Sequence, residues 1–278
     1  MIIVSAIHLT ALFSSGAIQY MNRIYLASLA AMTLALALAG YATAKETEDT
    51  RCFEMRTYYA PPGKLDDLHA RFRDHTMALF KKHGIENIGY FVPAENTNNT
   101  LVYLLAYPSR EAREASWKAF MADPDWKAAY KASEANGKLV SKVDQTFLQV
   151  TDFSPALKTG NVSKDGVFEL RTYTTPPGLL PNLDARFRDH TVALFKKHGM
   201  KNWVYFHKMP GQPEAENTLV YFLAHNSQDA AKASFDAFRK DPAWTAAKEA
   251  SEKPSGSLTV KDGVKSVFLV PTDYSPTK

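Results

Sequence analysis

Two histidines in identical surroundings are the residues of this chain best suited to acid–base or ligand chemistry. His75 lies in the segment ARFRDHT, which recurs unchanged around His190. The apolar residues on either side follow the three- and four-residue spacing of one helix face, so we expect both imidazoles to face a sheet. A buried imidazole needs a hydrogen-bond partner and could act as a general base, a haem ligand or a proton carrier. A core histidine bonded to a strand side chain is the structural alternative.

Glutamate, arginine and tyrosine alternate in two strand-like segments. The first set is Glu54, Arg56 and Tyr58, and the second is Glu169, Arg171 and Tyr173. Alternation places each set on one face of a β-strand. We expect that face inside a barrel, where its charges must pair. The arginine could hold an anionic group beside the carboxylate and the phenol. An ion pair that crosses between the two copies is the structural alternative.

Aromatic residues with helix-like spacing form a third candidate group. They could line an apolar pocket, although such stripes more often belong to a hydrophobic core. In the first copy they are Trp117, Phe120, Trp126 and Tyr130, and in the second they are Phe235, Phe238 and Trp244. The candidate ligand-binding tryptophans are Trp117, Trp126 and Trp244 from these groups, together with Trp203. Because the first copy has Ile88 where Trp203 stands, two equivalent pockets need not exist.

Several motifs for catalysis and metal binding are absent from the sequence. It contains no H-E-x-x-H, no C-x-x-C, no phosphate-loop glycines and no G-x-S-x-G. The eight histidines show no paired metal spacing, so we expect no dedicated metal centre. Basic residues are interleaved with acidic ones, which argues against the concentrated positive stripe of a nucleic-acid-binding protein.

The candidate residues belong to a duplicated module. Residues 53–84 and 168–199 are identical at 24 of 32 positions, with a constant offset of 115. Later matches have offsets of 118 and 121, and each shift is a three-residue insertion in a predicted loop. We therefore divide the chain into a first repeat at 45–155, a linker at 156–167 and a second repeat at 168–278.

Each copy predicts the same order of elements. Hydrophobic periodicity indicates strands and helices in the order β-α-β-β-α-β, a ferredoxin-like unit. In the first copy we expect strands at 53–59, 87–92, 100–107 and 145–150, and helices at 64–83 and 109–136. Asp123-Pro124 should break the second helix or start its second part. Helices cover only one face of such a sheet, and the other face needs a partner. We expect an α+β fold in which the two sheets pack face to face as an intrachain pseudo-dimer.

Residues 1–44 have the features of a secretory signal peptide. Arg23 precedes an apolar run at 24–40, and an A-x-A site follows at 42–44. The mature chain would begin at Lys45, in the periplasm or outside the cell, with no membrane span. An uncleaved anchor is the alternative, although the run is short for a span.

Two residues near this segment bear on how the chain begins. Met21 stands where a signal peptide should start, so we expect residues 1–20 to be an upstream extension that is not normally translated. Cys52 is the only cysteine, which excludes an intramolecular disulfide. We expect a thiol at the start of a strand, with an intermolecular bridge as the alternative.

Three recurring motifs resemble the NIPSNAP family. They are the F-E-x-R-T-Y strand, the following helix that ends in H-G, and F-x-x-D-P-x-W at 120–126 and 238–244. The motifs occur in order and twice, over almost the whole mature chain. The resemblance implies the dimeric α+β barrel superfamily, which also holds cofactor-free monooxygenases, haem-degrading enzymes and stress-response barrels. It implies a fold and no defined reaction.

Three hypotheses of function follow. The first is an exported, non-catalytic barrel without a cofactor that binds a small, partly apolar ligand or serves as a scaffold. The second is a cofactor-free monooxygenase or related oxidoreductase, in which His75 or His190 takes a proton from the substrate. The third is a haem-binding protein with either histidine as the axial ligand.

Overall fold

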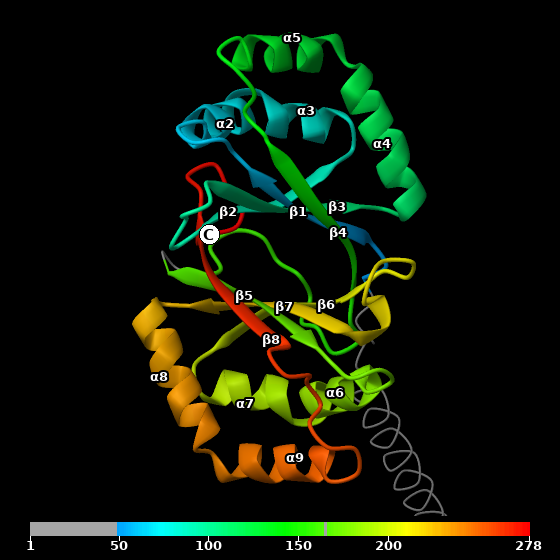
Figure 1. The fold of residues 1–278 in the computed structure, drawn as a ribbon, viewed down its shortest axis with the longest axis vertical. Coiled ribbons are helices and arrows are strands. Elements are labelled where there is room, and N and C mark those ends of the chain that lie inside the picture. The colour runs from blue at the N-terminus through cyan, green and yellow to red at the C-terminus, as the bar shows by residue number, and fades with distance from the viewer. Residues whose placement is uncertain (1–48, 164–165) are drawn as a thin grey trace, which may run out of the picture. The chain divides into compact units, whose positions relative to one another are not determined.

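The computed structural model describes residues 49–163 and 166–278, which form two similar halves around one closed barrel (Figure 1). The predicted signal peptide lies outside the described residues. The first half contains β1 (Cys52–Tyr59), α2 (Leu65–Arg71), the π-helical turn η1 (Phe72–Thr76), α3 (Met77–Lys82), β2 (Glu86–Pro93), β3 (Thr100–Tyr107), α4 (Arg110–Ala122), α5 (Pro124–Ser133) and β4 (Lys142–Val150). The second contains β5 (Val167–Thr174), α6 (Leu180–Arg186), the π-helical turn η2 (Phe187–Thr191), α7 (Val192–Lys197), β6 (Lys201–Lys208), the short η3 (Ala215–Asn217), β7 (Thr218–His225), α8 (Gln228–Arg239), α9 (Pro242–Glu252) and β8 (Val264–Pro271). The predicted β-α-β-β-α-β order therefore occurs twice.

The Asp-Pro pair divides the second helical region of each half into two helices. Asp123 follows α4 with extended backbone, and its carboxylate accepts a hydrogen bond from the backbone N–H of Asp125. Pro124 occupies the first turn of α5, where its missing N–H costs nothing. Asp241 caps α9 in the same way. No helix within 49–163 or 166–278 is long and apolar enough to cross a membrane.

The eight strands close into one antiparallel barrel in the order β1-β3-β2-β8-β5-β7-β6-β4. Within each half the strands pair over most of their length. The two halves join at their edges, where β2 pairs with β8 and β4 pairs with β6. This closure pairs the sheet edges and lets each sheet cover the inner face of the other. The predicted intrachain pseudo-dimer is confirmed.

The barrel interior is filled by apolar side chains from both halves. It includes Phe53, Phe91, Phe168, Trp203, Phe206 and Phe222, each almost fully buried. The rings of Phe91 and Phe168, from different halves, have their centroids 5.1 Å apart. Each half has one further core, which lies between its sheet and its own helices. The molecule is therefore layered as helices, sheet, sheet and helices (Figure 1).

The segment after the last strand of each half crosses to the other half. The backbone N–H of Thr151 donates to Tyr205, and that of Thr272 donates to Tyr90. Asp152 forms two hydrogen bonds of 2.8 Å with Arg188. Asp273 forms the equivalent pair of 2.7 Å with Arg73 in the first half. The repeated T-D-x-S-P motif is therefore a reciprocal clasp between the halves.

A candidate ligand site in the first repeat

The polar triad of β1 shares one face, as alternation predicted, but that face is not inside the barrel. Phe53 and Met55 pack in the barrel interior, whereas Tyr58 packs in the core beneath the helices. The expectation of a polar barrel interior was therefore wrong. Alternation shows which residues share a face, but it does not show whether helices or a second sheet will cover that face.

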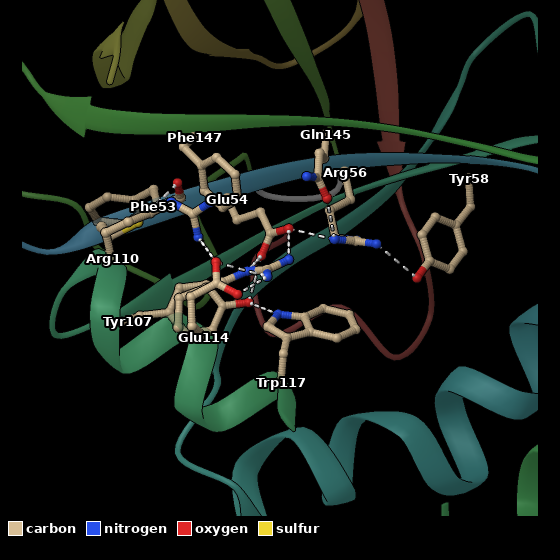
Figure 2. A network of polar contacts seen from close by, with 12 residues as sticks. Phe53, Glu54, Arg56, Tyr58, Tyr107, Arg110, Glu114, Trp117, Gln145 and Phe147 are labelled. Atoms are coloured by element: carbon tan, nitrogen blue, oxygen red, sulfur yellow. Dashed lines mark hydrogen bonds and ion pairs between the residues drawn. The ribbon is translucent and has the colours of Figure 1, made fainter. Parts of the chain in front are cut away.

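The centre of this polar face is Glu54, whose side chain is completely buried (Figure 2). Arg113 of α4 donates two hydrogen bonds to its carboxylate, at 3.0 Å from Nε and 2.8 Å from Nη2. Arg56 donates a third at 2.5 Å, and the hydroxyl of Tyr107 a fourth at 2.8 Å. The indole of Trp117 donates to the Tyr107 oxygen at 2.7 Å. The carboxylate is thus surrounded by donors.

These contacts determine the charges of the network. Burial alone would raise the pKa of Glu54, but the hydrogen bonds from Arg113 and the charges of both arginines lower it below its usual value. The carboxylate is therefore ionised at neutral pH, between two guanidinium groups. The ion pairs lie within one repeat, so the alternative of a pair that crosses between the copies was wrong.

A cavity of about 300 Å³ lies beside the network, between the sheet and the helices. Its walls contain the four aromatic residues whose spacing suggested a pocket, together with two buried arginines, one carboxylate and aliphatic groups. The lining residues used below are Arg56, Tyr58, Arg71, Trp117, Phe120, Trp126, Tyr130, Glu134 and Val143. A largely apolar cavity with a few converging polar groups has the composition of a small-molecule site.

Arg71 contributes the second buried guanidinium of this cavity. Its Nη1 donates to Glu134 at 3.2 Å and to Ser133 at 3.4 Å. Its Nε is buried without a hydrogen-bond partner, and its Nη2 makes no hydrogen bond to another described residue. The guanidinium carbon lies 5.5 Å from the ring centroid of Trp126 and 5.3 Å from that of Tyr130. Arg186 of the second repeat has the same contacts, with Ser251 and Glu252, and the same buried Nε without a partner.

The corresponding network of the second repeat has lost one arginine. Glu169 pairs with Arg171 at 2.5 Å and contacts the imidazole of His225 at 3.1 Å. Ser266 donates a further hydrogen bond at 2.5 Å. Ala231, completely buried, stands at the position of the second arginine of the first repeat. The two repeats therefore share a fold but not a site.

Comparison with known proteins agrees with the duplication. The NIPSNAP family model matches residues 53–155 and again residues 168–276. The chain belongs to the NIPSNAP family. Protein NipSnap homolog 3B of Mus musculus is 26% identical over 240 residues, covering 86% of this chain and 90% of that protein. Protein NipSnap homolog 3A of Homo sapiens is 25% identical over 253 residues, covering 90% and 96%.

Solved structures share the architecture at low sequence identity. A monooxygenase-like protein of Fusobacterium nucleatum superposes on 82% of this NIPSNAP chain, and on 95% of its own, with a TM-score of 0.53 at 12% identity. An anthrone oxidase-like protein covers 81% of the chain and 92% of its own, with a TM-score of 0.52 at 13% identity. These likenesses show the dimeric α+β barrel fold.

His75 and His190 are exposed in this NIPSNAP fold, and the prediction that they face the sheet was wrong. A π-helical turn adds residues to one helical turn at each site, so Thr76 and Thr191 take the buried positions. The hydroxyl of Thr76 donates to the carbonyl five residues earlier, at Arg71. Neither imidazole makes a hydrogen bond or ion pair with another described residue.

The tryptophans do not all converge. Trp117 and Trp126 line the cavity, whereas Trp203 is buried in the barrel interior and donates its indole N–H to the carbonyl of Lys158 at 2.8 Å. Trp244, in the second repeat, packs on Phe238 with ring centroids 4.4 Å apart. The structure thus brings two of the four candidate tryptophans to one site.

Sequence reasoning missed the arginines that complete the site. Arg71 lies in the ARFRDHT segment, which is identical in the two repeats, so no sequence feature distinguished it from the residues beside it. Arg113 could have been noticed, because the matched position of the second repeat is Ala231. Within residues 49–163 and 166–278 there is no cluster of three or more His, Cys, Asp or Glu side chains that could hold a metal ion.

Proposed function

We propose that this NIPSNAP protein binds a small, partly apolar ligand in the cavity of its first repeat. The observation that carries the proposal is the combination of aromatic walls with two guanidinium groups that are at least nine-tenths buried, Arg56 and Arg71. Burying a charge is energetically costly, and protein interiors are normally packed closely, without a cavity of this size. Both features are expected where a ligand completes the packing.

The two repeats allow a matched test of this proposal. Val143 lines the cavity at the surface of β4, and Val264 is its counterpart on β8 in the second repeat. Both side chains are exposed, at 41% and 44%, so tryptophan at either position should be tolerated. We expect Val143→Trp to obstruct the cavity, whereas Val264→Trp should leave it open.

The measurement is native mass spectrometry of gently purified protein. We expect a co-purifying small molecule on the wild-type chain and on Val264→Trp, and its loss from Val143→Trp. Retention of the same molecule by Val143→Trp would show that it binds elsewhere, which would refute the proposed site. The absence of any bound molecule from wild-type protein, together with no binding of added aromatic compounds, would refute the proposed function.

A cofactor-free oxygenase is the second candidate. It is favoured by the fold shared with the monooxygenase-like and anthrone oxidase-like proteins, which is an argument by analogy. The predicted bases His75 and His190 are exposed, so the lining carboxylate Glu134 is the better candidate to accept a proton. Oxygen consumption with phenolic substrates that disappears in Glu134→Gln would establish catalysis.

Haem binding stays a prediction for the two exposed imidazoles. Among the described residues that line the cavity there is no histidine, so a haem bound there would have no imidazole ligand. Titration with hemin tests the prediction, because ligation by His75 or His190 would give a strong visible absorption band that His75→Ala with His190→Ala removes.

We further propose that the protein is exported and functions in the periplasm or outside the cell. The proposal rests on the apolar run at 24–40 and the A-x-A site at 42–44. N-terminal sequencing of protein from the native host should give Lys45 as the first residue. Any first residue other than Lys45 would contradict cleavage at this site.

A further inference from the structure

We propose that the ligand of the first repeat is a small amphiphile whose compact head lies in the cavity and whose apolar chain leaves it across Met121, Tyr130 and Val143. This inference rests on the proposed function and specifies the chemical class of the ligand. Three features support it: the apolar side chains at the opening of the cavity, the small volume inside it, and the charged side chains at the matched positions of the second repeat.

The opening of the cavity is framed by exposed apolar side chains. Of the residues that line it, Met121, Tyr130 and Val143 alone are exposed, at 53%, 43% and 41%. They come from three elements, α4, α5 and β4. Within residues 49–163 these are also the only large apolar side chains that are exposed. Exposed apolar side chains that are scattered need no explanation, but a group of them around one opening indicates a contact surface. We call these three residues the rim.

The cavity inside the rim has room for a compact ligand group only. Its volume of about 300 Å³ is at the lower end of the range for small-molecule pockets. Aromatic rings such as those of Phe120 and Trp126 surround it, and the buried Arg56 adds a polar group to its wall. These walls suit a small, partly polar head. A longer ligand must pass through the opening, where the rim offers it an apolar surface.

The rim suits an apolar chain more than it suits a rigid group. The side chain of Met121 is unbranched and flexible, and such side chains adapt to apolar groups of different shapes. The ring of Tyr130 packs against that of Trp126, with centroids 5.6 Å apart, although almost half of the tyrosine remains exposed. A chain lying on this ring would remove apolar surface of both partners from water, which is favourable.

The second repeat shows that the fold does not require apolar residues at the rim. The positions that match Met121 and Tyr130 are Arg239 and Lys248. Both cations form ion pairs within their own helices, α8 and α9, and both side chains are more than half exposed. The same helices therefore fold with charged residues at these positions. Stability of the fold does not explain the apolar rim of the first repeat, whereas contact with an apolar chain does.

The experiment is isothermal titration of the full chain with 4-methylphenol and 4-hexylphenol, which share a head and differ in the chain. Full burial of one methylene strengthens binding about fourfold. The rim covers a chain only in part, so we expect 4-hexylphenol to bind at least about tenfold more tightly than 4-methylphenol. Equal affinity for the two compounds would overturn the chain inference while leaving the proposed ligand site intact. Binding of neither would also overturn it, and native mass spectrometry with Val143→Trp tests the cavity separately.

A double variant that copies the second repeat tests the rim itself. Met121→Arg with Tyr130→Lys should reduce the preference for 4-hexylphenol over 4-methylphenol at least about fivefold. Val267→Lys is the matched control, because Val267 is exposed at 44% but is not among the residues that line the cavity. This control should keep the wild-type preference. If the double variant keeps it too, the chain does not cross the rim and the inference fails.

Two further outcomes complete the test. An equal loss of preference in Val267→Lys and in the double variant would show that the chain binds exposed apolar surface in general, which would overturn the inference. Met121→Arg alone changes a single exposed side chain of α4 and should reduce the preference at least about twofold. This single variant provides the comparison with Val267→Lys even if the double variant folds poorly.

Discussion

Replacement of Glu54 by glutamine should be among the most destabilising single changes in the first repeat. The substitution keeps the shape of the side chain but removes the charge that three guanidinium hydrogen bonds of 2.5 to 3.0 Å converge on. Arg56 would remain buried without a carboxylate partner, and Arg113 would keep only its ion pair with the exposed Glu114. Breaking a buried ion pair from one side costs about 3–5 kcal/mol of unfolding free energy, so we expect a loss in that range.

The second repeat supplies the matched variant. Glu169 has one arginine partner, and its other contacts are His225 and Ser266. Glu169→Gln should therefore cost less, about 2 kcal/mol, the value of one charged hydrogen-bonded pair. In an Arg113→Ala background the cost of Glu54→Gln should fall towards that smaller value, because the two sites then resemble each other.

The assay is chemical unfolding of each variant, followed by far-ultraviolet circular dichroism at neutral pH. A double-mutant cycle of Glu54→Gln with Arg113→Ala isolates their coupling, which we expect at about 1–3 kcal/mol. If Glu54→Gln costs no more than Glu169→Gln, the second arginine adds nothing to the pairing.

Three further predictions concern the buried carboxylates, the π-helical turn and the single cysteine. The pKa values of Glu54 and Glu169 are lowered in the folded state. The stability that these carboxylates contribute is therefore present above their pKa of 4.5 in the unfolded chain and is lost as the pH falls below it. The free energy of unfolding, measured from pH 7 to pH 3, should decline from about pH 4.5. Thr76→Val removes the hydroxyl that bonds the Arg71 carbonyl in the π-helical turn and should cost about 1 kcal/mol in thermal unfolding, whereas an equal stability would show that the turn does not depend on this bond. Burial raises the pKa of the Cys52 thiol to about 11, so a thiol reagent at pH 8 should label it only after denaturation; rapid labelling of the native protein would contradict its burial.

The elements of this fold could be predicted from the sequence, but the side of the sheet on which the site lies could not. Alternation correctly grouped Glu54 with Arg56, and the Asp-Pro pair correctly marked a helix break. The same alternation is compatible with either face of the sheet being inside the barrel. His75 was misplaced for a different reason: the π-helical turn inserts its extra residue without a sequence signal such as proline or glycine. Arg113 was missed because it reaches Glu54 from 59 positions along the chain.

The two repeats act as an experiment on the same fold. Where they are identical, as in ARFRDHT, both copies use the residues to build the π-helical turn and the clasp between halves. Where they differ around the buried glutamate, the differences occur together. Ala231 replaces the second arginine, and the matched positions of its tyrosine and tryptophan partners are His225 and Phe235. Loss of the arginine alone would leave the Trp117 indole and the Tyr107 hydroxyl in place; their joint replacement indicates that the network changed as a unit. A duplicated barrel can change the network around one buried glutamate without disturbing its interior packing, because the barrel interior and the site lie on opposite faces of the same strands.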